Sequence, residues 1–142
     1  MSRRPRRPPP PSPRECRALG RAARAARRRA YAPYSQFAVG AALRTTTGRV
    51  VTGANVENAS YPLTICAERA AVARAVAEGC RRFDAVAVVA DSEGLTTPCG
   101  ACRQVLWEIC GDCWVWLENL AGESRLIPLS ELLPLPFDAH RL

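Results

Sequence analysis

The sequence contains no lysine and only one histidine, His140, in 142 residues. A Ser-His-Asp hydrolase and an HExxH metalloprotease both need histidine among the reacting groups, and His140 lies beyond the last recognisable element of the chain. These two classes of enzyme are therefore excluded. Aromatic residues make up only 6% of the chain and form no visible platform on which bases could stack, which argues against a protein that binds single-stranded nucleic acid through its bases.

Long hydrophobic runs are also absent. No run approaches the roughly 20 apolar residues that cross a bilayer, and the start, MSRRPRRPPPPSPRE, lacks the apolar core of a signal peptide. We therefore expect a cytoplasmic protein without a membrane partner, whose seven cysteines are free thiols or metal ligands rather than disulfides. The composition, 48% hydrophobic and 23% charged, is typical of a globular domain.

Positive charge is concentrated at the amino terminus. Residues 1–29 contain eleven arginines and one acidic residue, whereas residues 30–142 contain nine arginines and twelve acidic residues. Residues 1–14 are rich in Arg and Pro, so we predict a disordered arm there and a folded domain over residues 15–142. Because the body is mildly acidic, we expect no nucleic-acid partner, although the basic arm leaves non-specific binding to polyanions open.

Periodicity and turn residues predict an alternating α/β fold. The turn TTTG joins the first two strands into an antiparallel hairpin, Gly79 ends the second helix, and FDAVAVVAD reads as a buried strand. The order of elements predicts a three-layer α/β/α sandwich around a mixed five-stranded sheet, with right-handed crossovers before the later strands. The expected helices cover residues 15–30, 66–79 and 99–110, the expected strands cover 37–44, 49–55, 83–91, 113–119 and 124–129, and SELL (130–133) forms a last helical turn.

The stretch TPCGACRQ contains two cysteines, Cys99 and Cys102, which could be metal ligands. A third cysteine, Cys66, opens another predicted helix, so Cys66 and Cys99 both lie at helix starts, where free N–H groups stabilise a thiolate. Cys102 follows Cys99 by one turn, on the same helix face. Three thiolates from two adjacent helix starts can bind one zinc ion and leave the fourth position to water, which is the pattern of a catalytic zinc.

Glu68 follows Cys66 by two residues and therefore lies in the first helical turn, beside the predicted metal. A carboxylate there can take a proton from metal-activated water and deliver it to a substrate nitrogen. Arg69 and Arg103 are placed to donate hydrogen bonds to the sulfur atoms. A zinc site that only stabilised the fold would not need Glu68, so this residue favours an enzyme over a non-catalytic binding protein.

A second Cys-x-x-Cys pair, Cys110 and Cys113, offers an alternative four-cysteine zinc site together with Cys99 and Cys102. Only seven residues separate the two pairs, against about 15 to 20 in the usual pattern, and such a site would bend a helix that reads as continuous. Redox activity is no better supported, because the second pair falls at a helix end rather than a helix start. We expect buried or idle thiols at Cys16, Cys80, Cys110 and Cys113.

Cys-x-Glu on one helix followed by Pro-Cys-x-x-Cys on the next resembles the signature of the zinc-dependent nucleoside and nucleotide deaminases, in the variant with cysteine in place of histidine. Four motifs extend the resemblance to the small homotetrameric cytidine deaminases, over about residues 30–137. They are YAPYSQFAVGAAL (31–43), TGANVENASYPLTICAERAA (52–71), PCGACRQVL (98–106) and ELLP (131–134). The Arg/Pro-rich start and the end, PLPFDAHRL, depart from the family pattern.

The resemblance implies a cytidine-deaminase-like fold in which the three cysteines bind one zinc ion per subunit and Glu68 transfers protons. Arg69 and Gln104 match supporting positions around the metal. Without the resemblance, Asn55 and Glu57 would be interpreted as turn residues and Phe37 as a core residue. With it, the substrate contacts are Phe37 (a pocket wall), Asn55 and Glu57 (the ribose hydroxyl), Ala67 (the base, through its backbone), and Tyr61 and Phe137 (which reach a neighbouring subunit's site in a homotetramer).

The implied activity is hydrolytic deamination of cytidine and deoxycytidine to uridine and deoxyuridine plus ammonia, as in pyrimidine salvage. The resemblance implies that zinc-bound hydroxide attacks C4 of cytosine while Glu68 protonates N3 and then the departing amino group. Deaminases of cytosine-bearing nucleoside antibiotics have similar metal motifs, but NVENASY (55–61) supplies the ribose contacts of the plain nucleoside enzymes. Polynucleotide editing is a further alternative, which the acidic body and the few aromatic residues disfavour.

Overall fold

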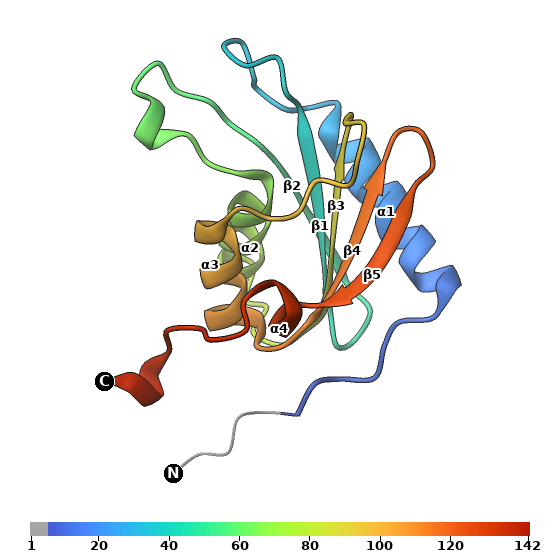
Figure 1. Ribbon diagram of the computed structural model, residues 1–142, viewed down its shortest axis with the longest axis vertical. Helices are drawn as coiled ribbons and strands as arrows, with labels where there is room; N and C mark the ends of the chain where they lie inside the picture. The colour runs from blue at the N-terminus through green and yellow to red at the C-terminus, as the bar shows by residue number, and fades with distance from the viewer. Residues whose placement is uncertain (1–5) are drawn as a thin grey trace.

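Five strands form one mixed sheet in the order β2-β1-β3-β4-β5 in the computed structural model, which describes residues 6–142. Helices cover both faces of this sheet, so the predicted three-layer α/β/α sandwich is confirmed (Figure 1). The strands are β1 (Val39–Thr45), β2 (Val50–Ala54), β3 (Phe83–Ala90), β4 (Trp114–Asn119) and β5 (Ser124–Pro128). The helices are α1 (Pro13–Arg27), α2 (Ala67–Ala77), α3 (Gly100–Cys110) and α4 (Leu129–Leu132), with short 3-10 helices η1 (Tyr61–Leu63) and η2 (Ala139–Arg141).

The strand pairing follows the predicted mixed pattern. β1 and β2 form an antiparallel hairpin, and its turn contains Gly48 with a φ of 91°. β3 pairs antiparallel with β1 and parallel with β4, and β5 lies antiparallel beside β4. Every residue of β3 is buried, as expected for a central strand that has helices on both faces.

The two helical layers differ in size. α1 alone covers one face of the sheet, where Leu19 and Ala23 contact small residues of β1 and β3. α2 and α3 lie side by side on the other face (Figure 1), over a larger aliphatic core that includes Leu43, Val86 and Leu106. This pairing sets the amino-terminal ends of α2 and α3 next to each other, which is the arrangement that the cysteine pattern requires.

Two glycines allow the helices to approach the sheet closely. A Cβ atom at Gly40 would lie 1.9 Å from the carbonyl oxygen of Ala23 in α1, and one at Gly53 would lie 2.4 Å from the backbone nitrogen of Ala71 in α2. Both distances are far shorter than a van der Waals contact, so any side chain at either position would push a helix outward. The position of α2, which carries Cys66 at its start, therefore depends on Gly53.

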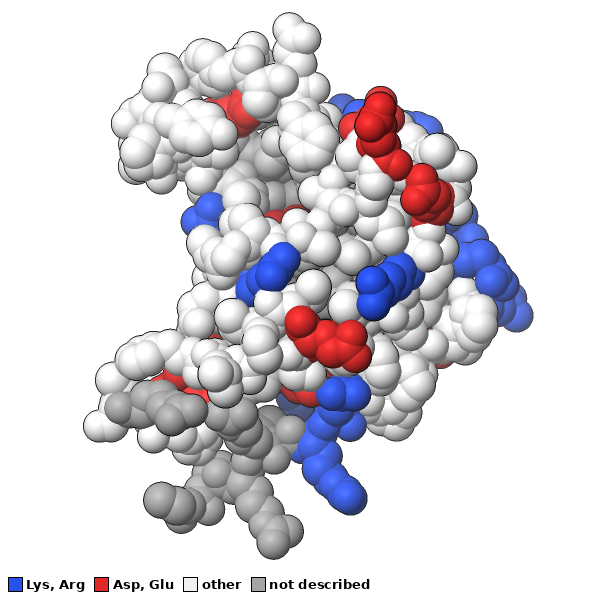
Figure 2. All heavy atoms as spheres, viewed as in Figure 1, with Lys and Arg blue, Asp and Glu red and all other residues white. Residues whose placement is uncertain are grey.

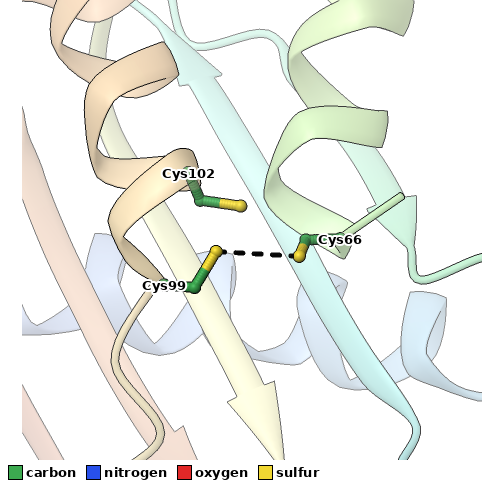
Figure 3. A group of neighbouring side chains, drawn as sticks. All are labelled: Cys66, Cys99 and Cys102. Atoms are coloured by element: carbon green, nitrogen blue, oxygen red, sulfur yellow. Dashed lines mark hydrogen bonds between the residues drawn. The ribbon is translucent and has the colours of Figure 1, made fainter. Parts of the chain in front are cut away.

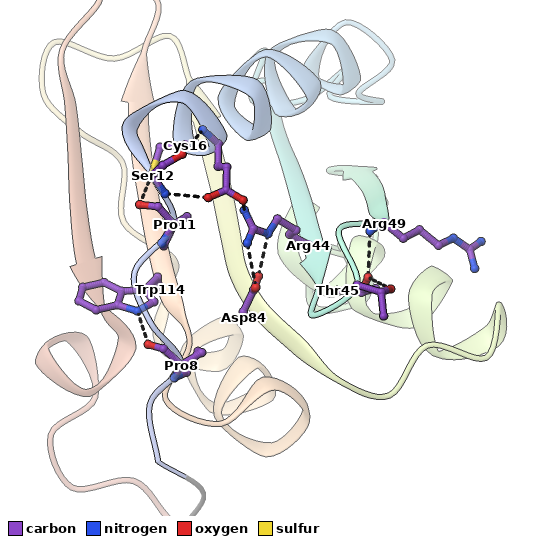
Figure 4. A network of polar contacts seen from close by, with 11 residues as sticks. Pro8, Pro11, Ser12, Cys16, Arg44, Thr45, Arg49, Asp84 and Trp114 are labelled. Atoms are coloured by element: carbon purple, nitrogen blue, oxygen red, sulfur yellow. Dashed lines mark hydrogen bonds and ion pairs between the residues drawn. The ribbon is translucent and has the colours of Figure 1, made fainter.

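Helix α1 is fixed at its start by a capping box between Ser12 and Glu15. The Glu15 carboxylate also accepts a hydrogen bond of 2.6 Å from Arg44 of β1, and Arg44 binds Asp84 of β3 through two bonds of 3.0 Å (Figure 4). Local capping and a cross-sheet ion pair thus act at the same helix end. No helix in the described part of the chain is long and apolar enough to cross a membrane.

The Arg/Pro-rich segment differs from the predicted disordered arm. Residues 6–12 lie against the end of the sheet, where the indole nitrogen of Trp114 donates to the Pro8 carbonyl at 2.9 Å (Figure 4). Arg7 forms an ion pair of 2.9 Å with Asp112 and lies 5.3 Å from the centroid of the Trp114 ring. Prolines restrict the unbound conformations of this segment, so ordering it costs less entropy than for an ordinary tail. Residues 1–5 lie outside the described residues.

Replacing Arg7 by Ala is expected to lower the free energy of unfolding by about 1 kcal/mol, because one exposed ion pair and one cation–π contact are lost. Arg6→Ala is the matched control, since Arg6 forms no hydrogen bond or ion pair with any described residue, and its effect should stay within about 0.5 kcal/mol. Urea unfolding monitored by tryptophan fluorescence measures both values. Equal effects of the two substitutions would contradict the packing of this segment.

Candidate active site

Three thiols converge where α2 and α3 begin. Cys66 and Cys99 are the N-cap residues of these helices, and both have extended backbone angles. With Cys102, one turn into α3, their sulfur atoms all lie within 4.8 Å of one another (Figure 3). The Cys66 and Cys99 sulfurs are 3.8 Å apart, which matches the edge of about 3.8 Å expected for a tetrahedron with Zn–S bonds of about 2.3 Å. The donor set therefore fits zinc.

The pKa values of the thiols are also consistent with a metal-binding role. Hydrogen bonds from Cys102 and from Arg69 lower the pKa of the Cys66 thiol to about 5, and the Arg69 guanidinium lies 3.4 Å from its sulfur. The bond to Cys66 also raises the pKa of the Cys102 thiol, which keeps its proton. A metal ion would displace that proton. Cys102 is buried and Cys99 is exposed, so the cluster opens outward on the Cys99 side.

Glu68 lies in the first turn of α2, as predicted from its spacing to Cys66. Its carboxyl is buried with 5% of the residue exposed, and this burial raises its pKa, while hydrogen bonding with Cys102 acts in the opposite direction. The carboxyl is thus beside the cysteine cluster and shielded from bulk water. A buried carboxyl in this position can accept a proton and return it to a bound molecule.

The two arginines predicted to bind the sulfurs have different partners. Arg69 donates to Cys66 as expected, and its Nε has no hydrogen-bond partner among the described residues. For Arg103 the prediction is wrong. Its guanidinium donates to the carbonyl oxygens of Pro98 and Leu132 at 2.7 and 2.8 Å and to the Thr97 hydroxyl at 2.9 Å. Arg103 therefore connects the turn before Cys99 to the last residue of helix α4.

Replacing Arg103 by Ala is expected to weaken metal binding by about tenfold, because the turn that positions Cys99 loses three hydrogen bonds. Arg81→Ala is the matched control. Arg81 also donates to two carbonyl oxygens, those of Val76 and Cys80, at the opposite end of α2. Competition with a chromogenic chelator measures zinc affinity in both variants. If Arg81→Ala weakened zinc binding as much as Arg103→Ala, the effect would be one of general stability.

Asn55 and Glu57, predicted to bind the ribose, hold the loop before β1. The Asn55 amide donates to the Phe37 carbonyl and accepts from the Val39 N–H, both at 2.8 Å. The Glu57 carboxylate accepts from the Tyr34 and Ser35 N–H groups at 2.9 and 3.1 Å and from the Ser35 hydroxyl. The hydroxyl bond lowers the pKa of Glu57. Ser35 was not predicted as a partner of Glu57, although it lies within the motif YAPYSQFAVGAAL (31–43), because nothing in the motif indicates which side chain its hydroxyl binds.

The remaining predicted contacts lie on three separate segments. Ala67 is buried at the first position of α2, where its N–H has no helical acceptor. Phe37 is 40% exposed, so the alternative reading as a core residue is wrong. Tyr61 in η1 and Phe137 near the carboxyl terminus are more exposed, at 69% and 61%. Gln104 of α3 donates to the Phe137 carbonyl at 2.6 Å and so fixes the end of the chain beside the metal-binding helix.

The alternative four-cysteine site is excluded by the geometry of α3. Cys110 is the last residue of this helix, about 12 Å along the axis from Cys102. A hydrogen bond with Cys113 and burial raise the pKa of Cys110 well above its usual value, so it stays a thiol. Cys16 and Cys80 each form one weak sulfur hydrogen bond, with Pro11 and Arg49.

A three-layer sandwich with three thiols and a buried carboxyl at two adjacent helix starts is an α/β architecture whose cysteine cluster could hold a metal ion. The family model described as the cytidine and deoxycytidylate deaminase zinc-binding region matches residues 14–118. The chain therefore belongs to the cytidine and deoxycytidylate deaminase family, and it is a hydrolytic deaminase.

Individual relatives agree with this assignment. The chain is 55% identical over 112 residues to the cytidine deaminase of Halalkalibacterium halodurans, covering 78% of this chain and 85% of that protein. The structure of cytidine deaminase from Burkholderia pseudomallei superimposes with a TM-score of 0.83 at 52% identity, covering 85% of this chain and 98% of that one. The blasticidin-S deaminase of Bacillus cereus is more distant, at 33% identity over 107 residues, 70% of this chain and 76% of that protein.

Proposed function

We propose that this chain is a zinc-dependent enzyme that deaminates cytidine and deoxycytidine to uridine and deoxyuridine with release of ammonia, a reaction of pyrimidine salvage. One observation carries the proposal. The sulfurs of Cys66 and Cys99 are spaced as zinc ligands, and the buried Glu68 lies in the helical turn that Cys66 opens. The 55% identity to a named cytidine deaminase supports the choice of cytosine as the base.

Cys66, Cys99 and Cys102 would hold one zinc ion per chain, and Lewis-acid activation of water is the chemistry that the ion supplies when bound. Three thiolates would give the site a net negative charge, which disfavours ionisation of water. The chain offsets this charge in two ways. Arg69 donates to the Cys66 sulfur, and the starts of α2 and α3 direct their free N–H groups and positive dipole ends at the cluster.

Glu68 would move both protons that hydrolysis of cytosine requires. Its carboxylate takes a proton from water as the water oxygen bonds to C4 of the base, and it delivers that proton to N3. It then takes the second proton from the hydroxyl now on C4 and delivers it to the amino group, and the C4–N bond breaks as the C4 carbonyl forms and ammonia leaves. Burial of Glu68 keeps bulk water from intercepting these protons.

The sugar and base would be held by groups that already order the site. One N–H of the Asn55 amide is engaged by Phe37, and the other remains for a ribose oxygen, while Glu57 has further acceptor capacity on its carboxylate. The N–H of Ala67 at the start of α2, which has no partner among residues 6–142, would bind the base, and the partly exposed ring of Phe37 would form a pocket wall.

A homotetramer would complete the pocket. Tyr61 and Phe137 expose 69% and 61% of their surfaces on two separate segments, as expected for side chains that enter a neighbouring subunit's site. A monomer would leave both rings in water, at a cost of roughly 1.5 to 3 kcal/mol each relative to burial. Sedimentation velocity of the purified chain determines the oligomeric state.

The substrate is tested by the loss of the cytosine absorption band in zinc-replete protein. Cytidine, deoxycytidine and blasticidin S are incubated in parallel with the same preparation. Turnover of the first two with little turnover of blasticidin S is the expected result. Turnover of blasticidin S alone would replace the proposed substrate with a nucleoside antibiotic, and turnover of none would overturn the proposed function.

A further inference from the structure

The exposed face of α1 and its C-cap residue present a row of arginines whose side chains have no partner among the described residues. Arg14, Arg17, Arg21 and Arg28 lie within an arc of about 60° on the helix and span about 21 Å along its axis. All four are exposed, and within residues 6–142 none of their side chains forms a hydrogen bond or ion pair. Arg24, on the flank of the helix, behaves differently, because it binds Glu118 and the Asn119 carbonyl.

Glu118 of β4 lies beside α1, but its carboxylate is bound by Arg24 and by the Trp116 indole and pairs with none of the four arginines of the row within residues 6–142. The only acidic residue of α1 is Glu15, whose carboxylate is bound by the Ser12 N–H and by Arg44. Figure 2 shows basic side chains at the margin of the molecule where α1 lies. Beyond the end of α1, Arg28 and Arg29 line a groove of about 740 Å³ beside the edge strand β2, and Arg74 of α2 lines it as well. The positive row therefore continues into a concave surface.

We propose that the exposed face of α1 binds the phosphate backbone of a nucleic acid without reading its bases. One guanidinium group can donate two parallel hydrogen bonds to the oxygens of one phosphate. A row of such groups about 21 Å long can contact several phosphates of one strand. The side chains between the arginines are small, Ala18 and Ala25. The face therefore has no aromatic ring on which a base could stack and no large apolar group that would enter a membrane.

The structure adds a rigid arrangement of arginines to the charge that sequence alone reveals near the amino terminus. Sequence alone predicts a helix over residues 15–30 that contains Arg17, Arg21 and Arg28, and it leaves non-specific binding to polyanions open without favouring it. In the structure, Arg14, Arg17 and Arg21 belong to α1 and Arg28 is its C-cap residue, and this helix is fixed against the sheet through Leu19 and Ala23. A rigid row loses less conformational entropy on binding than a flexible arm with the same charge.

Fluorescence anisotropy with a labelled single-stranded RNA of about 24 nucleotides tests the proposal in the full chain. Five phosphate contacts, from the four arginines of the row and Arg29, give a slope of about −3.5 for log K against log salt. Affinity should then fall about 100-fold between about 50 and about 200 mM salt. The variant R17A/R21A should reduce the slope to about −2.1, and alanine favours the helix at both positions.

The matched control is R82A/R125A, which removes the same charge from exposed arginines outside α1. This control should keep the wild-type slope of log K against log salt. Both double variants should also keep wild-type deamination. A loss of RNA binding can therefore be told apart from a loss of the proposed enzymatic function. If the slope decreased equally in the two double variants, RNA binding would depend only on the net charge of the chain, and the proposal would be overturned. Absence of RNA binding at low salt would overturn it, as would binding only to vesicles containing phosphatidylserine.

Discussion

Glu68→Gln is expected to lower kcat for cytidine by about 10³-fold, within the range of about 10²- to 10⁴-fold for positioned proton transfer. Glutamine has the same size and fits the buried position, which is 5% exposed in the wild type, but it cannot accept and return a proton. Zinc content should stay at the wild-type value because Glu68 is not a ligand. Initial rates at saturating cytidine, together with metal analysis of the same samples, measure both quantities.

The control for this experiment is Glu78→Gln on the same helix. Glu78 pairs with Arg49 and Arg74 at the far end of α2, so the substitution removes an equal charge without touching the site. Its kcat should remain within about twofold of wild type, since loss of surface ion pairs costs little. Retention of more than about a tenth of wild-type kcat in zinc-loaded Glu68→Gln would show that another group transfers the protons.

Replacing Cys102 by Ser is expected to remove most of the bound zinc and reduce deamination to less than about 1% of wild type. Cys102 is fully buried and its sulfur lies within 4.8 Å of the other two, and a hydroxyl is a far weaker zinc ligand than a thiolate. Metal analysis after gel filtration and the absorbance assay with cytidine are the two measurements. Removal of zinc from wild-type protein by a chelator should produce the same loss of activity, reversed when zinc is returned.

Cys110→Ser makes the matched comparison, since Cys110 lies at the other end of the same helix. Zinc content and activity should both remain close to wild type. If Cys110→Ser lost zinc and Cys102→Ser kept it, the metal would lie at the second cysteine pair, and the assignment of Cys66, Cys99 and Cys102 would be wrong.

Much of the site was accessible from sequence because its determinants are local. The spacing of Cys99 and Cys102, the proline before them and the periodicity of the two helices fix which residues lie at helix starts. The convergence of Cys66 with this pair required one further inference, that two helices on the same face of a sheet are neighbours. Gly53 makes that packing close, since a Cβ there would lie 2.4 Å from α2.

The contacts that sequence did not reveal connect distant segments. Arg7 and Asp112 are 105 positions apart, so composition alone predicted disorder where the structure has an ordered segment. Arg103 was assigned to the sulfurs because it adjoins Cys102, yet one of its partners is the carbonyl of Leu132, 29 positions away. A long guanidinium side chain reaches several acceptors, and which one it binds depends on tertiary packing.

The most direct test of the account is to run the reaction on cytidine in water enriched in ¹⁸O and to analyse the products by mass spectrometry and an ammonia assay. Hydrolytic deamination at C4 predicts uridine with a single ¹⁸O atom in its base and one ammonia for each uridine formed. Unchanged cytidine in the presence of zinc-replete protein, or uridine without the label, would contradict it.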